Sequence, residues 1–342
     1  SGDRVGTLAW NSDRHLSLYY GVSGSGAVLH TVNPRLFAEQ IVYIINHAED
    51  RVLFFDITFA PLVSQLAPSL ETIETFVVMT DRDHMPDVPG VPPDRLLCWD
   101  DVIGRQSTHY DWPEFDERSA SSLCYTSGTT GNPKGVLYSH RSTLLHGLAV
   151  NNTDGLAIGA ADSVMPVVPM FHVNAWGIPY AAAAVGSRLI LPGPRLDGES
   201  LAHLIVDEKV TVAAGVPTIW LGLLNALDTS GLKPVTLKRT VVGGSALPPS
   251  MRAASKRSTS SRISSSSSSE PSGLMAASPL YAPAASGGTE ASSGYACPMP
   301  RLGRDSGGRG ARWSAATSPR GWRPRAWTRR PWCSAATPCS SS

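Results

Sequence analysis

Residues 125–135 read YTSGTTGNPKG, a run of hydroxyl and glycine residues that ends in one lysine. Gly128 and Gly131 permit backbone conformations that side chains forbid, so successive N–H groups can turn toward one concavity that anions favour. Lys134 adds a mobile positive charge. Four hydroxyl side chains lie in the same run: Thr126, Ser127, Thr129 and Thr130. These residue types in this order predict a loop that holds the phosphates of ATP.

The flanks of this loop indicate which elements position it. The nucleotide-binding pattern G-x-x-x-x-G-K-[ST] does not fit, because Lys134 follows Pro133 and precedes Gly135. Residues 122–125 and 135–139 both read as strands. We therefore expect the loop to join two strands.

Three further segments could contribute to the same site. Residues 169–177 place His172 and Trp176 four positions apart, hence on one face if that segment is helical. Residues 212–220 read as an apolar strand, a turn and a helix, and residues 241–246 as a short buried strand that breaks into glycines. Each segment alone also fits an ordinary core histidine, a core tryptophan or a strand end. Their order and spacing together favour a site.

Together these segments resemble the adenylate-forming (AMP-binding) superfamily, which includes acyl-CoA synthetases, aryl-CoA ligases, luciferases and nonribosomal adenylation domains. Residues 2–11, 26–35 and 171–176 most resemble medium- and long-chain fatty acyl-CoA ligases. An aryl-acid ligase or a short-chain sulfur-compound ligase would share much of the pattern, so chain length stays open. The resemblance covers about residues 1–251 and disfavours a luciferase or adenylation domain.

The resemblance implies a ligase that joins a carboxylic acid, most readily a fatty acid, to CoA through acyl-AMP. It implies ATP, Mg²⁺ and CoA as cofactor or co-substrates. The implied catalytic residues are His172 and Lys134. The implied nucleotide-binding residues are Thr126, Ser127, Gly128, Thr129, Thr130, Gly131, Lys134, Gly243, Gly244 and Ser245. Trp176, Asn174 and Val216 are implied to line a substrate tunnel, and Thr126 to bind the metal. A module that binds nucleotide without turnover is the alternative.

The elements before the loop alternate between helix and strand. Residues 33–46 begin with an N-cap and a proline. They predict a helix that places four apolar side chains on one face: Phe37, Ile41, Ile44 and Ile45.

Further along, residues 51–56 and 75–79 read as buried strands, and residues 60–70 as a helix. The polar stretch 81–119 is expected to wrap the surface. This alternation predicts an α/β fold of helix-flanked, mostly parallel sheets. The resemblance implies an incomplete large domain of the adenylate-forming fold.

Composition limits the remaining classes. With 42% hydrophobic residues in 342 and no run of eighteen apolar residues, we expect a cytoplasmic protein without a membrane span or a nucleic-acid partner. The five cysteines are odd in number and lie at no metal-ligand spacing: Cys98, Cys124, Cys297, Cys333 and Cys339. We expect reduced thiols, with Cys124 buried as a small apolar strand residue rather than acting as a nucleophile.

The composition changes sharply near residue 252. Residues 253–342 carry twelve Lys and Arg against three Asp and Glu, a net charge of +9, whereas the preceding residues carry 17 against 25, a net charge of −8. Ordering such a segment costs roughly 1–2 kcal/mol per residue with little apolar surface to bury, so we expect disorder. The sequence thus predicts a partial AMP-binding domain over 1–252 and a low-complexity tail over 253–342.

A basic linker and a modulating extension are two interpretations of that tail. A shifted reading frame is the one we favour, because the residue set is what GC-rich codons yield when misread. Motifs that relatives carry downstream are not found, and Thr289-Glu290 matches one of them by chance. We therefore expect a fragment without useful ligase activity. Some relatives form homo-oligomers, so the oligomeric state stays open.

Overall fold

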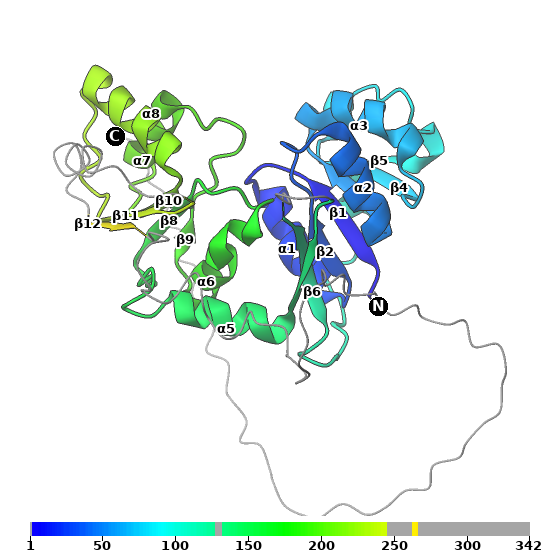
Figure 1. Ribbon diagram of the computed structural model, residues 1–342, viewed down its shortest axis with the longest axis horizontal. Coiled ribbons are helices and arrows are strands. Elements are labelled where there is room, and N and C mark those ends of the chain that lie inside the picture. Colours follow the sequence, from blue (N-terminus) through cyan, green and yellow to red (C-terminus); the bar gives the residue numbers. More distant parts are fainter. Residues whose placement is uncertain (1, 127–131, 245–261, 266–342) are drawn as a thin grey trace, which may run out of the picture. The chain divides into compact units, whose positions relative to one another are not determined.

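The computed structural model describes residues 2–126, 132–244 and 262–265 of the chain. These residues form two β-sheets with helices packed on their faces (Figure 1). Across the described residues, no helix combines the length and the apolar character that crossing a membrane requires.

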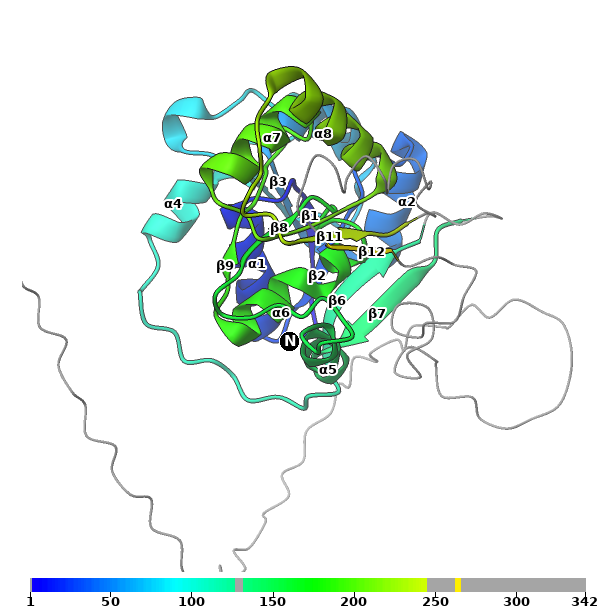
Figure 2. The ribbon, with the colours of Figure 1, turned by 90° about the vertical axis from the view of Figure 1, so that its left-hand side faces the viewer.

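The first sheet has seven strands in the order β5-β4-β3-β1-β2-β6-β7. All neighbours in it are parallel except β6 and β7, which form an antiparallel hairpin pair at one edge (Figure 2). The strands are β1 (Arg4–Leu8), β2 (Val28–Thr31), β3 (Asp50–Phe55), β4 (Thr75–Val78), β5 (Leu96–Cys98), β6 (Ala120–Tyr125) and β7 (Gly135–Ser139). The hairpin confirms that the predicted phosphate loop joins two strands.

Helices cover the first sheet because they bury one apolar face. Helices α2 (Ala38–Ala48) and α3 (Ala60–Leu66) pack on it through fully buried residues such as Ile41, Ile44 and Val63. A second apolar cluster joins Leu18 and Tyr19 of α1 (Asp13–Gly24) to residues of α6 (Ile178–Val185) and of the second sheet. The first and second sheets are therefore separated by a shared layer that contains α1 and α6.

The second sheet has five parallel strands in the order β12-β11-β10-β8-β9. These strands are β8 (Ser163–Pro166), β9 (Arg188–Leu189), β10 (Val212–Gly215), β11 (Arg239–Val242) and β12 (Arg262–Ser265). A third cluster packs α7 (Gly198–Asp207) and α8 (Pro217–Ser230) against it, which Figure 1 shows beside β10 and β11. The α/β fold of mostly parallel sheets is confirmed.

The helix predicted from Asn33 begins later than expected, at Ala38. The side chain of Asn33 accepts a hydrogen bond from the Arg35 backbone N–H at 3.0 Å, so it stabilises a turn instead of a helix start. Phe37 is extended and caps the helix, and its side chain is 76% exposed. Its predicted place on the buried face was therefore wrong, whereas Ile41, Ile44 and Ile45 are buried there as predicted.

Two other expectations need correction. The helix predicted over 60–70 ends at Leu66 and continues as the 3₁₀ turn η2 (Ala67–Ser69), because Pro68 lacks an N–H for a regular helix. The stretch 81–119 is not only a surface wrap. It contains η3 (Arg82–His84), η4 (Pro93–Arg95), the edge strand β5 and α4 (Trp99–Gly104).

One short strand lies inside the tail predicted to be disordered. Residues of β12 pair with β11 in parallel, from Arg239 opposite Arg262 to Val242 opposite Ser265. Ordered backbone thus extends past residue 252 at these four residues, because the open edge of β11 offers unpaired backbone groups. The boundary at 252 otherwise stays a prediction, since residues 245–261 and 266–342 lie outside the described residues.

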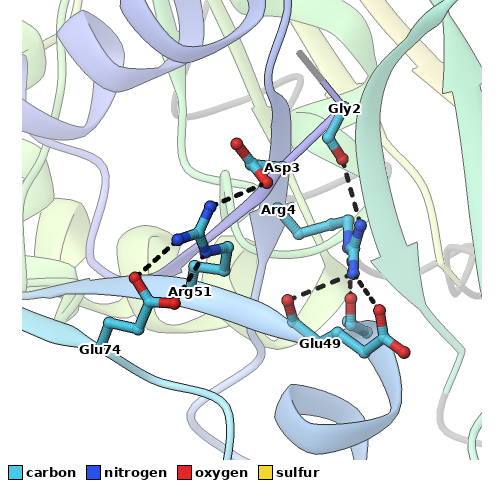
Figure 3. A network of polar contacts seen from close by, with 7 residues as sticks. Gly2, Asp3, Arg4, Glu49, Arg51 and Glu74 are labelled. Atoms are coloured by element: carbon cyan, nitrogen blue, oxygen red, sulfur yellow. Dashed lines mark hydrogen bonds and ion pairs between the residues drawn. The ribbon is translucent and has the colours of Figure 1, made fainter. Parts of the chain in front are cut away.

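Charged side chains tie elements together at the amino-terminal edge of the first sheet (Figure 3). Arg4 donates to the backbone carbonyls of Gly2, Ala48 and Glu49 and pairs with the Glu49 carboxylate at 2.6 Å. Arg51 binds both carboxylate oxygens of Glu74 at 2.8 and 3.0 Å. These contacts fix the end of α2 against β1 and β3, at the edge opposite the predicted site.

Candidate functional site

The predicted site residues follow the carboxyl ends of parallel strands. Thr126 follows β6 in the first sheet, and Val216 and Gly243 follow β10 and β11 in the second. Residues 167–172 follow β8. In open α/β sheets, ligands bind in the crevice outside the carboxyl ends of the strands. The topology therefore places the predicted residues at ligand-binding edges.

The base of the predicted phosphate loop is a closed hairpin. The Thr126 backbone N–H donates to the Lys134 carbonyl at 3.0 Å, and the Thr126 hydroxyl approaches the same oxygen at 3.4 Å. Both side chains are exposed, whereas Pro133 is buried. The remaining predicted loop residues lie outside the described residues, namely Ser127, Gly128, Thr129, Thr130 and Gly131.

Tyr125 anchors the start of this loop. Its ring is 8% exposed, and its hydroxyl lies 2.7 Å from Nδ1 of His47 on α2. Burial, followed by the negative charge of Asp50, raises the pKa of the Tyr125 hydroxyl well above its ordinary value. The neutral phenol therefore ties the loop to the helix layer on one face of the sheet.

Residues 173–177 form a left-handed turn, η5 (Val173–Gly177), rather than the helix assumed for one-face placement of His172 and Trp176. The φ angles of Val173, Asn174, Ala175 and Trp176 lie between 47° and 56°, and that of Gly177 is 73°. Left-handed backbone costs roughly 1–2 kcal/mol for each residue that carries a Cβ. The condition for placing His172 and Trp176 on one face of a right-handed helix is therefore not met, and tertiary contacts must stabilise this turn.

Asn174 provides several of those contacts. Asn174 is 6% exposed, and its Nδ2 donates to the Ser122 hydroxyl at 3.0 Å. Its Oδ1 accepts from the Cys124 thiol at 3.2 Å and from the Tyr19 hydroxyl at 3.4 Å. Asparagine also tolerates left-handed backbone better than most residues. The amide thus joins η5 to β6 and α1.

Gly177 and His146 stabilise the other end of the turn. Nε2 of His146 lies 3.2 Å from the Trp176 carbonyl oxygen and binds it. A Cβ on Gly177 would lie 2.5 Å from Cδ2 of His146. Real Cβ atoms do not come that close to another heavy atom. The close approach of His146 favours glycine at this position, and the positive φ costs glycine less than a residue with a Cβ.

His172 is exposed and lies directly before the turn. Desolvation by neighbouring protein, and secondly the positive charge of Arg35, lower the pKa of its imidazole. Arg35 also lies 5.6 Å above the Phe171 ring, and Trp10 meets that ring edge-on at 6.1 Å. A neutral imidazole is therefore favoured, which can both donate and accept a hydrogen bond.

Arg35 and Trp10 were not among the predicted site residues. A signal for them existed, because Trp10 follows β1 and Arg35 follows β2 at the same carboxyl edge as Thr126. Both also lie in the stretches that carry the family resemblance. Because ligands bind at the carboxyl ends of parallel strands, the positions of Trp10 and Arg35 after β1 and β2 would have marked both as site residues.

The glycine segment after β11 lies against the start of α8. The Gly243 N–H donates to the Gly215 carbonyl at 3.3 Å, and Gly244 has a φ of 86°. A Cβ on Gly244 would lie 3.3 Å from Cγ1 of Val216, so the structure brings two of the predicted residues into contact. Ser245 lies outside the described residues.

Cys124 is buried and carries a free thiol. Burial raises the pKa of this thiol to about 11, although a hydrogen bond with Thr31 opposes the shift. A thiol with that pKa is almost wholly protonated at neutral pH and is a poor nucleophile. The expectation of a buried strand residue is confirmed for Cys124, and Cys98 is buried as well.

Comparison with known proteins gives consistent results. Over 250 residues the chain is 59% identical to a 3-methylmercaptopropionyl-CoA ligase of Ruegeria pomeroyi, covering 73% of this chain and 46% of that protein. It is 55% identical over 251 residues to a medium-chain-fatty-acid–CoA ligase of Ectopseudomonas oleovorans, covering 73% and 45%. A long-chain-fatty-acid–CoA ligase of Thermus thermophilus is 50% identical over 252 residues, with 74% and 44% covered. The chain thus spans about half the length of the curated relatives it matches.

Solved structures support the same fold. The crystal structure of the anthranilate CoA ligase AuaEII in complex with anthranoyl-AMP superposes with a TM-score of 0.67 at 25% identity, over 77% of this chain and 49% of that one. A family model described as AMP-binding enzyme matches residues 1–266. The chain belongs to the AMP-binding enzyme family.

Proposed function

We propose that this chain carries the ATP- and acid-binding part of an acyl-CoA ligase. The observation that supports this most is the position of the predicted residues directly after the carboxyl ends of strands: Thr126 after β6, residues 167–172 after β8, Val216 after β10 and Gly243 after β11. Relatives named as CoA ligases favour the same reaction. A fatty acid of medium or long chain is the substrate class we propose, with a short sulfur-containing acid as the alternative that one relative's name suggests.

The proposed chemistry has two steps. A carboxylate oxygen attacks the α-phosphorus of ATP, the bond to the bridging oxygen breaks, and pyrophosphate leaves with both electrons of that bond. The CoA thiolate then attacks the acyl carbon of acyl-AMP, and AMP departs. Both reactants of the first step are anions, so the protein must supply donors and positive charge where charge accumulates.

Each predicted residue has a role in this scheme. Lys134, Thr126 and the loop between them would hold the β- and γ-phosphates, while Gly243 and Gly244 would lie against the adenine. His172 would donate a hydrogen bond to the acid carboxylate. Its lowered pKa suits that role because a neutral imidazole donates without requiring desolvation of a full charge. Trp176, Asn174 and Val216 remain the proposed boundary of the acyl site.

Mg²⁺ would neutralise phosphate charge in this reaction. Within residues 2–126, 132–244 and 262–265, no group of three or more His, Cys, Asp or Glu side chains could hold a metal ion. Mg²⁺ in phosphate-transfer sites takes only one or two protein ligands and keeps phosphate oxygens and waters. The exposed Thr126 hydroxyl therefore fits as the protein ligand of a nucleotide-bound Mg²⁺.

Ligand-dependent thermal stability tests the binding half of the proposal. ATP with Mg²⁺ at a hundred times its Kd should stabilise the chain by about 2.7 kcal/mol. Lys134→Ala should weaken that binding by about ten- to a hundredfold, since a charge-assisted hydrogen bond contributes about 1.5–3 kcal/mol. Lys233→Ala is the matched control, because Lys233 is an exposed lysine in the loop after α8. Equal losses in the two variants would contradict the assignment.

Turnover is measured separately with acids of two, four, eight, twelve and sixteen carbons and with 3-methylmercaptopropionate. We expect this polypeptide to bind ATP without forming acyl-CoA. Acyl-CoA produced at rates within tenfold of a full-length relative would overturn the expected inactivity and would identify the preferred acid. Binding of ATP without any acyl-adenylate would favour the nucleotide-binding module.

A further inference from the structure

The side chain of Asn174 is fully engaged inside the protein. Its amide donates to Ser122 and accepts from Cys124 and Tyr19, and the residue is 6% exposed. A residue that contacts substrate needs a free surface, whereas this amide uses its polar atoms on protein partners. Its contribution to an acyl site must therefore act through the residues it holds.

The partners of Asn174 lie on the strand that leads to the phosphate loop. Ser122 and Cys124 are alternate residues of β6, so their side chains share one face of the sheet. Thr126 begins the loop two residues after Cys124. The Asn174 amide thus binds two residues of β6 that lie two positions apart, just before the predicted loop begins. These bonds hold η5 at one position along β6.

Asn174 is also central to the left-handed turn. Residues on both sides of it share positive φ, and the next residue, Ala175, is fully buried. The backbone N–H of Ala175 donates to the His172 carbonyl at 3.1 Å, which links His172 to the same turn. Displacing the Asn174 amide would therefore move both His172 and Trp176.

We propose that Asn174 is a positioning residue that fixes η5, and with it His172 and Trp176, to β6 just before Thr126, where the predicted phosphate loop begins. This inference rests on the proposed function and assigns Asn174 an indirect role in place of direct contact with the acyl chain. The recognised ligand is an acyl-adenylate, because that molecule must reach both the phosphate side and the η5 side of the site.

The test compares three ligands on the full 342-residue chain by isothermal titration. These are ATP with Mg²⁺ and two non-hydrolysable acyl-adenylate analogues, acetyl- and dodecanoyl-sulfamoyladenosine. Asn174→Gly removes the amide but keeps the positive φ at no steric cost. Ser122→Ala removes the hydroxyl on β6 that accepts the hydrogen bond from Asn174. Asn46→Ala is the matched control, because Asn46 donates to Ser69 and accepts from Glu71 in the same way but lies on α2.

The proposal predicts a specific pattern. Asn174→Gly weakens both analogues by about tenfold or more, a change of about 1.4 kcal/mol, whereas ATP affinity changes less than about twofold. Ser122→Ala weakens both analogues by a smaller factor, and the double variant equals Asn174→Gly alone because the two residues act as one unit. Asn46→Ala leaves the ratio of analogue to ATP affinity unchanged.

Other outcomes separate the ideas. A loss confined to the dodecanoyl analogue, together with no effect of Ser122→Ala, would assign Asn174 to the acyl tunnel and overturn the positioning role. Unchanged analogue affinity in every variant would overturn it as well. If Asn174→Gly does not fold, Ser122→Ala still decides, because its effect must be equal for the two analogues. Failure of the wild-type chain to bind any of the ligands would instead contradict the proposed function.

Discussion

His172 shows how surroundings, rather than residue type, decide what a side chain can do. Desolvation and the nearby Arg35 both favour its neutral form, although the side chain is exposed. The sequence predicted His172 as a site residue, whereas Arg35 was not singled out although it lies in a stretch that carries the family resemblance. Tertiary packing brings Arg35, which follows β2 of the first sheet, against Phe171, which follows β8 of the second.

His15 makes stability sensitive to acid. It is fully buried between Thr7 and the Trp10 carbonyl, and burial lowers its pKa to about 4, against a hydrogen bond to Trp10 that opposes the shift. The unfolded chain has the higher pKa, so stability is complete above pH 6.5 and is lost as pH falls toward 4. The loss should reach about 2–3 kcal/mol at pH 4.5.

Urea unfolding at pH 7.5 and 4.5 measures this loss. His15→Gln cannot titrate, so its free energy of unfolding should depend less on pH by that amount, although it is lower at pH 7.5. Parallel pH profiles of the two proteins would show that His15 is not the group responsible.

Asp56 should act in the opposite direction. Burial raises the pKa of its carboxyl to about 6, while a hydrogen bond from the Trp10 N–H at 2.6 Å opposes the shift. Because the folded pKa is the higher one, stability present below pH 3.8 is lost as pH rises through 6. Asp56→Asn keeps an acceptor for Trp10 and should gain about 3 kcal/mol at pH 8 but nothing at pH 3.5. Chemical unfolding at both values checks this, and an equal change at both would refute it.

At the scale of elements, patterns that depend on local backbone chemistry were predicted well. The β6–β7 hairpin, the β10–α8 unit with Pro217 in its first turn, and the strand that Gly243 follows were all predicted from residue order. The left-handed η5 did not, because nothing in residues 173–176 disfavours an ordinary helix strongly enough. Contacts with β6, α1 and His146 select it, and those contacts are remote in sequence.

Two glycines allow the packing of η5 to be measured. Gly177 and Gly186 have nearly equal φ angles of 73° and 70°, but only Gly177 faces a close neighbour, His146, whereas a Cβ on Gly186 would meet nothing within 4 Å. Gly186→Ala should cost about 1 kcal/mol for its backbone alone. Gly177→Ala should cost at least about 1 kcal/mol more, since overpacking typically adds 1–3 kcal/mol.

Thermal unfolding of both variants gives the difference, and His146→Ala in the Gly177→Ala background should recover part of it. Equal destabilisation by the two glycine substitutions would show that His146 does not restrict the turn.

At the scale of the whole molecule, Asn11 is one of the residues that link the segments after the two sheets. The Asn11 side chain donates to the Pro166 and Val168 carbonyls at 2.8 and 2.9 Å and accepts from the Met170 N–H at 2.7 Å. The sequence predicted helices and strands, but it did not predict that Asn11 would bind the segment that follows β8. Asparagine can match three backbone groups at once because it carries the donors and the acceptor of a peptide.

The sequence also predicted a change of character at residue 252, and that domain boundary stays a prediction. The family match reaches residue 266, and β12 pairs with β11 up to Ser265. The four residues of β12 can pair there because a serine-rich segment still donates and accepts backbone hydrogen bonds at an open sheet edge. Disorder of the remaining tail stays a prediction.

Two truncations test where the folded domain ends. A chain of residues 1–266 should match the 342-residue chain in unfolding free energy and ATP affinity, because every described contact is retained. A chain of residues 1–252 should be less stable by at least about 1 kcal/mol, since β11 keeps β10 but loses its parallel partner β12 and each backbone hydrogen bond contributes about 0.5–1.5 kcal/mol. Hydrogen exchange at Thr240–Val242 should rise in the shorter chain alone. Equal protection in both truncations would return the boundary to 252, and loss of stability in the longer one would give the basic tail a structural role.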